Sequence, residues 1–310
     1  MVYTRAGAGI MPQQNQQMSY TPESLGLDSS IVVIPPFSGH YKNILVPERF
    51  SDRIVSHVLS QYLSGNHFFC PPMFLAIEGA PGEGKTSQTI ASLSQKGILV
   101  LYVSATNFSG AHEAESKKVF EKFYTAAVNL RKSGHVVALV VDDFHKSIAN
   151  EDKRVTRTVN TDLLTGYMMN ITENNGELKV PIILTANDFS KVYAPLLRNG
   201  RADIYPWQPD YDEKKQIIAQ LFNGFVINFS DNLFDRFFDE FKDENIAFFV
   251  QLKNRHRLGT ITEYMKQFAR FGTGEIYQLD EIVKQQIAQV SLKELKTTAK
   301  AQIAERSGKK

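Results

Sequence analysis

Eight consecutive residues, Gly79 to Thr86, read GAPGEGKT and match the phosphate-loop pattern G-x-x-x-x-G-K-[ST]. An apolar run of strand length, 73–78, precedes them, and a helical pattern begins at Thr86. In that context the loop N–H groups and the first helical turn form a positively polarised nest for phosphate oxygens. Lys85 can reach the β- and γ-phosphates, and the Thr86 hydroxyl can ligate Mg²⁺, so the motif predicts a nucleoside triphosphate site. We expect nucleotide contacts from Gly79, Ala80, Pro81, Gly82, Glu83, Gly84, Lys85, Thr86 and Ser87.

Two carboxylates, Asp142 and Asp143, directly follow another apolar run, 136–141. In a parallel sheet the carboxyl ends of the strands form the edge at which nucleotides bind. We expect Asp142 to complete the Mg²⁺ shell and Asp143 to polarise a water for attack on the γ-phosphate. Phosphoryl transfer depends on such positioning and charge neutralisation. Two solvent-facing aspartates after a core strand are the alternative.

An amide follows the next apolar run, 180–185, at Asn187. Its neutral side chain can donate to a phosphate and orient the attacking water. A plain turn asparagine is the alternative, because asparagine is common in turns. The place of Asn187, one strand after the aspartate pair, favours the functional interpretation.

Composition limits the class of protein. The 310 residues are 43% hydrophobic and 22% charged, and a net charge of +2 gives no general attraction to nucleic acid. The single cysteine, Cys70, cannot form an internal disulfide, and its aromatic and proline neighbours predict a buried, inert thiol. No apolar run approaches the ~20 residues that span a bilayer, so we expect a cytoplasmic protein without a membrane partner. Residues 1–30 are poor in acids but hold Arg5 alone as a basic residue, which leaves the plastid stroma as the alternative.

Strand and helix patterns alternate in the first two thirds of the chain. The apolar runs have strand length and alternate with helical patterns at 49–63, 114–131 and 159–173, which indicates an α/β fold with a parallel sheet. The five expected strands are 73–78, 98–103, 136–141, 180–185 and 202–207.

Helical patterns alone follow residue 210 and indicate a smaller helical domain. The expected helices are 212–222, 231–241, 260–271 and 279–304. The predicted division is a flexible N-terminal arm at 1–38, a nucleotide-binding α/β domain at 39–209, a helical lid at 210–295 and a tail at 296–310.

The stretch from Val180 to Arg201, VPIILTANDFSKVYAPLLRNGR, resembles the segment of Rubisco activase, an AAA+ ATPase, that runs from sensor 1 to the arginine fingers. The likeness extends from about Ile44 to Ala288. Residues 47–63 are similar to the helix with which the family's domain begins, and 159–171 also have the family's pattern. Residues 247–255 resemble its sensor-2 segment.

The resemblance implies an AAA+ core with a five-stranded parallel sheet and a helical lid. It further implies ATP with Mg²⁺ as ligands and a homo-oligomeric ring, a hexamer, with ATP sites between subunits. By position Asn187 would be sensor 1, and Arg198 and Arg201 would be arginine fingers that enter the neighbour's site. Arg255 would be the sensor-2 arginine, with Lys253 as the second candidate. Surface ion pairing is the alternative for Arg198 and Arg201.

The family engages its target with loops that line the central pore of the ring. The matching first loop is 107–112, in which Phe108 and His112 would contact a substrate chain. Phe108 could equally be a buried residue after the strand. A second pore loop or a solvated basic loop would be 145–157. Its basic residues are Lys146, Lys153, Arg154 and Arg157.

Three functions fit these features. The first is an ATP-driven ring that remodels a protein client, with Rubisco as the client and release of inhibitory sugar phosphates as the activity. The second is a nucleic-acid-associated AAA+ ATPase of a phage or mobile element, in which the 145–157 loop contacts phosphates. The third uses the triphosphate as an assembly switch. The chain departs from the family at Asp142, where asparagine is usual, and at His145, where aspartate is usual. Because of these departures the identity of the client stays open.

Overall fold

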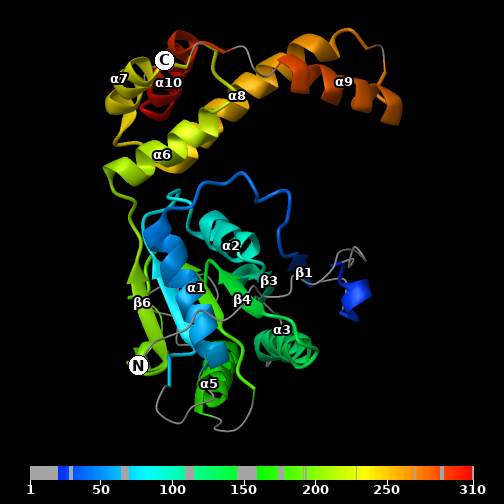
Figure 1. The fold of residues 1–310 in the computed structure, drawn as a ribbon, viewed down its shortest axis with the longest axis vertical. Helices are drawn as coiled ribbons and strands as arrows, with labels where there is room; N and C mark the ends of the chain where they lie inside the picture. The colour runs from blue at the N-terminus through cyan, green and yellow to red at the C-terminus, as the bar shows by residue number, and fades with distance from the viewer. Residues whose placement is uncertain are drawn as a thin grey trace, which may run out of the picture.

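A computed structural model describes residues 20–27, 31–63, 70–108, 115–144, 159–173, 178–190, 192, 194–227, 229–268, 270–286 and 290–308. An α/β domain occupies the lower part of Figure 1 and a helical domain, the lid, lies above it. The segment between β6 and α6 joins them. Of the described residues, no helix is both long and apolar enough to cross a membrane.

One sheet of six strands forms the centre of the α/β domain, in the order β1-β3-β4-β5-β2-β6. All neighbouring strands are parallel except β1, which is antiparallel to β3. β2 and β4 consist almost wholly of buried residues, as expected for strands covered on both faces. The strands are β1 (Val32–Ile34), β2 (Phe74–Glu78), β3 (Leu99–Ser104), β4 (Val137–Asp142), β5 (Ile182–Ala186) and β6 (Ala202–Pro206).

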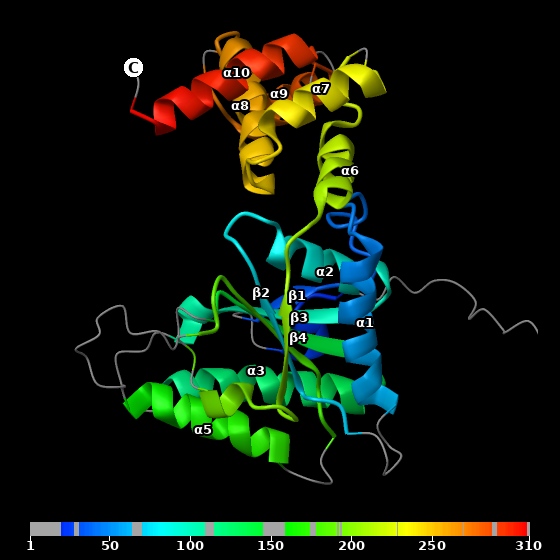
Figure 2. The same cartoon turned by 90° about the vertical axis from the view of Figure 1, so that its left-hand side faces the viewer.

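Helices cover both faces of the sheet (Figures 1 and 2). On one face, α1 (Glu48–Leu63) contributes Phe50, Ile54 and Val58 to a core shared with α2 (Lys85–Gln95). These three side chains are fully buried, and each such burial contributes about 1.5–3 kcal/mol. The other face is covered by α3 (Glu115–Lys132) and α5 (Val159–Glu173). Short 3₁₀ turns complete the domain at Glu23–Leu25, Ala105–Phe108 and Ala194–Leu197.

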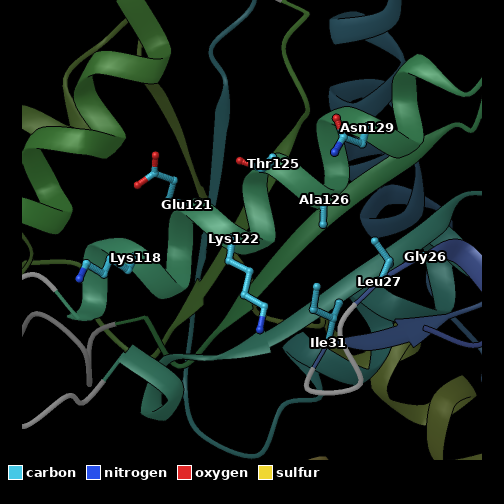
Figure 3. A pocket seen from close by; sticks show the side chains of 9 residues that line it. All are labelled: Gly26, Leu27, Ile31, Lys118, Glu121, Lys122, Thr125, Ala126 and Asn129. Atoms are coloured by element: carbon cyan, nitrogen blue, oxygen red, sulfur yellow. The ribbon is translucent and has the colours of Figure 1, made fainter. Parts of the chain in front are cut away.

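The sixth strand, β1, corrects the expectation of a five-stranded sheet and of a flexible arm through residue 38. Ile31 and Ile34 are buried, and the Phe37 N–H donates to the Ser94 carbonyl at 2.7 Å. The segment thereby pairs the edge of β3 that would otherwise expose its backbone groups. Figure 3 shows Leu27 and Ile31 beside Ala126 of α3, around a pocket of about 450 Å³. A three-residue strand is too short to stand out in a segment rich in serine and proline. Residues 1–19 and 28–30 of the predicted arm lie outside the described residues.

In the described part of the lid, five helices surround a core of buried phenylalanines. The core includes Phe222, Phe225, Phe234, Phe237, Phe238, Phe241, Phe248 and Phe249. Capping boxes begin two of the helices, one built by Asp210 with Glu213 and the other by Ser291 with Glu294. The helices are α6 (Tyr211–Phe222), α7 (Asp231–Phe241), α8 (Ile246–Met265), α9 (Thr273–Gln286) and α10 (Leu292–Arg306).

The lid differs from the sequence prediction at its C-terminal end. The helix expected at 260–271 is wrong at both ends, because α8 runs without a break from Ile246 and ends at Met265. The helix expected at 279–304 is divided into α9 and α10, because Ser291 caps a new helix. The predicted tail at 296–310 belongs largely to α10, where Leu295, Ala299 and Gln302 are buried. The S-x-x-E spacing at 291–294 was the signal for this start.

Cys70 is exposed, which corrects the prediction of a buried thiol. It precedes β2 together with Pro71 and Pro72, outside the strand that enters the core. The prediction was wrong because apolar neighbours in the sequence do not by themselves bury a residue, and the buried segment begins only at Met73.

Candidate nucleotide site

The predicted phosphate loop connects the end of β2 to the start of α2. The N-cap of α2 is Gly84, which has no side chain, so no N-cap side chain accepts from the N–H groups of the first turn. A Cβ at Gly79 would lie 2.2 Å from the Trp207 carbonyl oxygen, so only glycine allows this close approach. Gly82 has φ 83°, and a Cβ there would also collide with Asn245, the N-cap residue of α8. The backbone thus forms the cradle that a phosphate needs.

The strand register brings the other predicted site residues to this loop. Glu78 at the end of β2 pairs with Ala186 of β5, so Asn187 lies beside the loop. β4 pairs with β5 on its other side, with Val141 opposite Leu184, so Asp142 and Asp143 follow next along the same edge. The three parallel strands therefore deliver the loop, the amide and the carboxylates to one place.

Lys85 lies within this cluster and is buried, with 8% of its surface exposed. Its Nζ donates to the carbonyls of Gly79 at 2.7 Å and Ala80 at 2.9 Å, and to Asn187 Oδ1 at 3.1 Å. Burial lowers the pKa of Lys85, and the carboxylates of Asp143 and Asp142 partly oppose this effect. The Lys85 ammonium is thus held beside the loop, where the oxygens of a bound phosphate would replace the carbonyls of Gly79 and Ala80 as its partners.

Three hydroxyl groups donate to the Asp142 carboxylate. Oδ1 accepts from the Oγ1 of Thr86 and, at 2.6 Å, from the Oγ1 of Thr185. Oδ2 accepts from the Tyr102 hydroxyl at 3.0 Å. Burial, followed by the charge of Asp142, raises the pKa of Tyr102, so this phenol stays a hydrogen-bond donor. Sequence reasoning missed Tyr102 and Thr185, although both lie near the ends of strands that flank β4.

Thr86 and Asp142 supply the hard oxygen donors that Mg²⁺ takes in proteins. Within the described part of the chain, no group of three or more His, Cys, Asp or Glu side chains could hold a metal. A magnesium ion here would therefore depend on the phosphates and water for its remaining ligands, which is usual for this ion. The contact between Thr86 and Asp142 fits such a site.

Asp143 adopts a left-handed backbone conformation with φ 54°, which aspartate enters more easily than most residues. Its N–H donates to Thr185 Oγ1 at 3.2 Å, and its side chain lines the pocket together with Lys85 and Asn187. Asp143 thus lies at the same pocket as Lys85 and Asn187, and its action on an attacking water stays a prediction.

The pocket has a volume of about 730 Å³ and lies between the α/β domain and the lid. The apolar side chains of Ile44, Ile217 and Leu221 line it, beside the phosphate loop. Of the nine predicted nucleotide contacts, six line it: Pro81, Gly82, Gly84, Lys85, Thr86 and Ser87. Gly79, Ala80 and Glu83 do not line the pocket, and their carbonyls hold the loop by accepting hydrogen bonds from Lys85 and Trp207.

The lid presents one face of α8 to the pocket, formed by Ala247, Val250, Gln251 and Asn254. The two predicted sensor-2 candidates are not on it. Arg255 forms an ion pair with Glu305 of α10 at 2.6 Å, and Lys253 Nζ donates to the Leu221 carbonyl at 2.5 Å. Their role stays a prediction, and it requires these two side chains to leave their present partners.

The two predicted arginine fingers lie at the opposite edge of the sheet. The Phe74 N–H, at the start of β2, donates to the Arg201 carbonyl at 3.0 Å, whereas the phosphate loop follows the end of β2. Arg201 is held within its own chain, since Nη1 donates to the Pro195 carbonyl at 2.6 Å and Nη2 pairs with Glu173. Arg198 is exposed.

The predicted pore residues fall mostly outside the described residues. The backbone of Phe108 ends a 3₁₀ turn after β3, but its side chain is not described. His112 and the 145–157 loop, with Lys146, Lys153, Arg154 and Arg157, lie outside the described residues.

Residues 75–209 match the family model described as "ATPase family associated with various cellular activities (AAA)". These residues form an AAA domain. The match spans the phosphate loop, the aspartate pair, Asn187 and both predicted fingers. Membership of this domain family implies nucleotide binding and supports an ATPase.

The chain is similar to Rubisco activases over more than half of its length. The Nostoc sp. (strain PCC 7120 / SAG 25.82 / UTEX 2576) protein is 30% identical over 190 residues, which are 57% of this chain and 46% of the relative. Activase 1 of Larrea tridentata is 29% identical over 218 residues, 66% of this chain and 45% of the relative. The chain thus spans about half the length of these relatives. A crystal structure of the FIGL-1 AAA domain superposes on this chain with a TM-score of 0.63, and the matched part is 93% of this chain and 92% of the FIGL-1 chain. At 14% identity this likeness shows the fold.

Proposed function

We propose that this chain is a Mg²⁺-dependent ATPase that assembles into a ring and remodels a protein client, with Rubisco as the first client to test. The similarity to Rubisco activases supports the client, and the site geometry supports hydrolysis between subunits. Release of inhibitory sugar phosphates is the activity this assignment predicts.

One observation carries the proposal: the nucleotide site is short of positive charge. Among the described residues that line the pocket, Lys85 is the one cation. A triphosphate in phosphoryl transfer normally meets a second cation that stabilises the charge on the transferring group. Arg198 and Arg201 lie beyond the far end of β2, five residues or about 16 Å from the loop, which supports a role for them in another copy's site.

Each predicted residue has a task in that composite site. The ammonium of Lys85 would bind the β- and γ-phosphate oxygens and leave the carbonyls of Gly79 and Ala80. Asn187, released from Lys85, would orient the attacking water, and Asp143 would polarise it. Bound Mg²⁺, held by Thr86 and Asp142, would supply neutralisation of the phosphate charge.

ATP turnover measured against protein concentration tests the motor. We expect turnover per chain to rise with concentration, because each site needs a neighbour, and Lys85→Ala to abolish it. Turnover that is independent of concentration in a monomeric protein would contradict the composite site.

A Rubisco reactivation assay tests the client. Rubisco blocked by a sugar phosphate should recover carboxylation when wild-type protein and ATP are added, and the Lys85→Ala protein is the matched control. Recovery equal to that of the control would remove Rubisco as the client and leave the ATPase assignment standing. A parallel titration with DNA and RNA across a salt series would show stimulation only if the nucleic-acid function were correct.

A further inference from the structure

Two exposed surfaces of opposite character lie on the lid. The first is a groove of about 380 Å³ between α7 and α10, which we call the lid groove. Its apolar lining residues are Ile227, Leu233, Phe237 and Leu292, and its cationic ones are Arg236, Lys293 and Lys296. Ile227 and Leu233 are 42% and 51% exposed, so the apolar surface is open to a partner.

The cations of the lid groove are only partly neutralised. Lys296 pairs with Glu240 at 2.5 Å. Within the described part of the chain, no ion pair involves Arg236 or Lys293. An apolar surface with surplus positive charge fits an amphipathic helix that carries carboxylates.

The second surface is such a helix, and it belongs to this chain. Ile276 and Tyr277 of α9 are 58% and 67% exposed. Asp280 and Glu281 follow each of them by four residues, so a carboxylate lies one turn from each apolar side chain on the same face. One stretch of α9 thus combines both properties that the lid groove would recognise.

The two surfaces cannot meet within one chain in this arrangement. α9 extends to one end of the lid, whereas α7 and α10 form the other end (Figure 1), and the view in Figure 2 places α9 behind them. A contact between two different surfaces of identical chains is head-to-tail, and it generates a ring if the rotation closes.

We propose that α9 of one copy binds the lid groove of the next copy, with Ile276 and Tyr277 on the apolar lining and Asp280 and Glu281 beside Arg236 and Lys293. The inference rests on the proposed ring and names one of its contacts. Charge pairs of this kind fix the register and orientation of a contact and make it sensitive to salt.

Charge reversal tests the contact. The groove variant is Arg236→Glu with Lys293→Glu, and the helix variant is Asp280→Lys with Glu281→Lys. Sedimentation velocity with ATP and Mg²⁺ at low salt should show assembly of the wild type, and assembly of either variant weakened at least tenfold. An equimolar mixture of the two variants should assemble again, because each mutant surface then meets its opposite charge on the other chain. The chain with all four reversals should also assemble.

Three results would overturn the proposal: variants that assemble like the wild type, a mixture that does not recover, and a wild type that stays monomeric. Thermal unfolding and binding of a fluorescent ATP analogue should match the wild type in every variant, which separates lost contact from lost fold. If the wild type assembles and hydrolyses ATP while the variants also assemble, this contact is wrong and the proposed function stands. If the lid groove binds some other acidic helix and not α9, the variants should assemble like the wild type.

Discussion

Glu83 Oε1 and Lys214 Nζ lie 3.5 Å apart, and the two side chains are only 11% and 12% exposed. This ion pair joins the phosphate loop to the first helix of the lid. Two further bonds do the same from α8, since the Ala247 N–H donates to the Gly82 carbonyl at 2.9 Å and Asn245 Nδ2 donates to the Pro81 carbonyl at 3.2 Å. A movement of the phosphate loop on nucleotide binding would therefore be transmitted to the lid.

Lys214→Ala should lower the free energy of unfolding by about 1–3 kcal/mol, because it leaves the Glu83 carboxylate buried without its cation. Adding Glu83→Gln should recover part of the loss, since an amide tolerates burial better than a charge. Lys215→Ala, which breaks the more exposed pair with Asp235, is the matched control and should cost clearly less than Lys214→Ala. If chemical denaturation gives the same loss of unfolding free energy for Lys214→Ala and Lys215→Ala, the buried pair of Glu83 and Lys214 stabilises the protein no more than an exposed pair does.

Tyr102→Phe should weaken Mg²⁺-dependent nucleotide binding by about tenfold, because it removes one of the donors that orient Asp142. Binding of a fluorescent ATP analogue is measured with Mg²⁺ and again with a chelator. The affinity without the metal should not change. Tyr205→Phe is the control, because the buried Tyr205 hydroxyl has no hydrogen-bond partner among the residues that the structure describes. A loss of the same size in the chelator would assign Tyr102 a merely structural role.

The sequence predicted the edge of this sheet that holds the candidate nucleotide site better than it predicted the periphery of the sheet. Asp142, Asp143 and Asn187 could be placed because parallel strands end at one edge, and the register confirms that they converge on the phosphate loop. Tyr102 and Thr185 were not predicted as site residues, because a hydroxyl that donates to a carboxylate leaves no spacing pattern in a single sequence.

The lid and the N-terminal edge show a different limit. The register of α8 decides which residues face the pocket, and it places Asn254 there and Arg255 on Glu305. A one-residue difference on a helix turns a side chain by about 100°, which a motif match does not resolve. β1 was missed because its stability comes from pairing with β3, a contact between segments distant in the sequence.

The folded protein should lose stability as the pH falls through the range of His57. Burial, reinforced by Arg53, lowers the pKa of His57 to about 4 from an ordinary 6.5. Above pH 6.5 the imidazole is neutral in both states and the full stability is present. Below that pH the unfolded chain binds a proton that the folded chain does not, so up to about 3 kcal/mol is lost by pH 4. His57→Gln should remove this part of the slope in denaturant titrations between pH 7 and 4.5, and parallel curves for the two proteins would refute the assignment.

Arg198→Ala and Arg201→Ala should separate a finger from a structural arginine. Arg201→Ala should lower the unfolding free energy by about 1–2 kcal/mol, because it removes the bonds to Pro195 and Glu173. Arg198→Ala, at an exposed position, should leave stability unchanged and still reduce hydrolysis. Thermal unfolding of both variants gives the comparison, and a destabilised Arg198→Ala protein would argue against a free finger.

The central claim, that each site is completed by the neighbouring copy, is tested most directly by mixing two inactive variants. Lys85→Ala removes the cation of the phosphate loop, and Arg198→Ala removes the finger, so each protein alone should turn over ATP at least a hundredfold more slowly than the wild type. In an equimolar mixture, sites with Lys85 from one chain and Arg198 from the next should restore about a quarter of the wild-type rate. If mixed oligomers form and the rate stays at the level of the single variants, the site is not shared between copies.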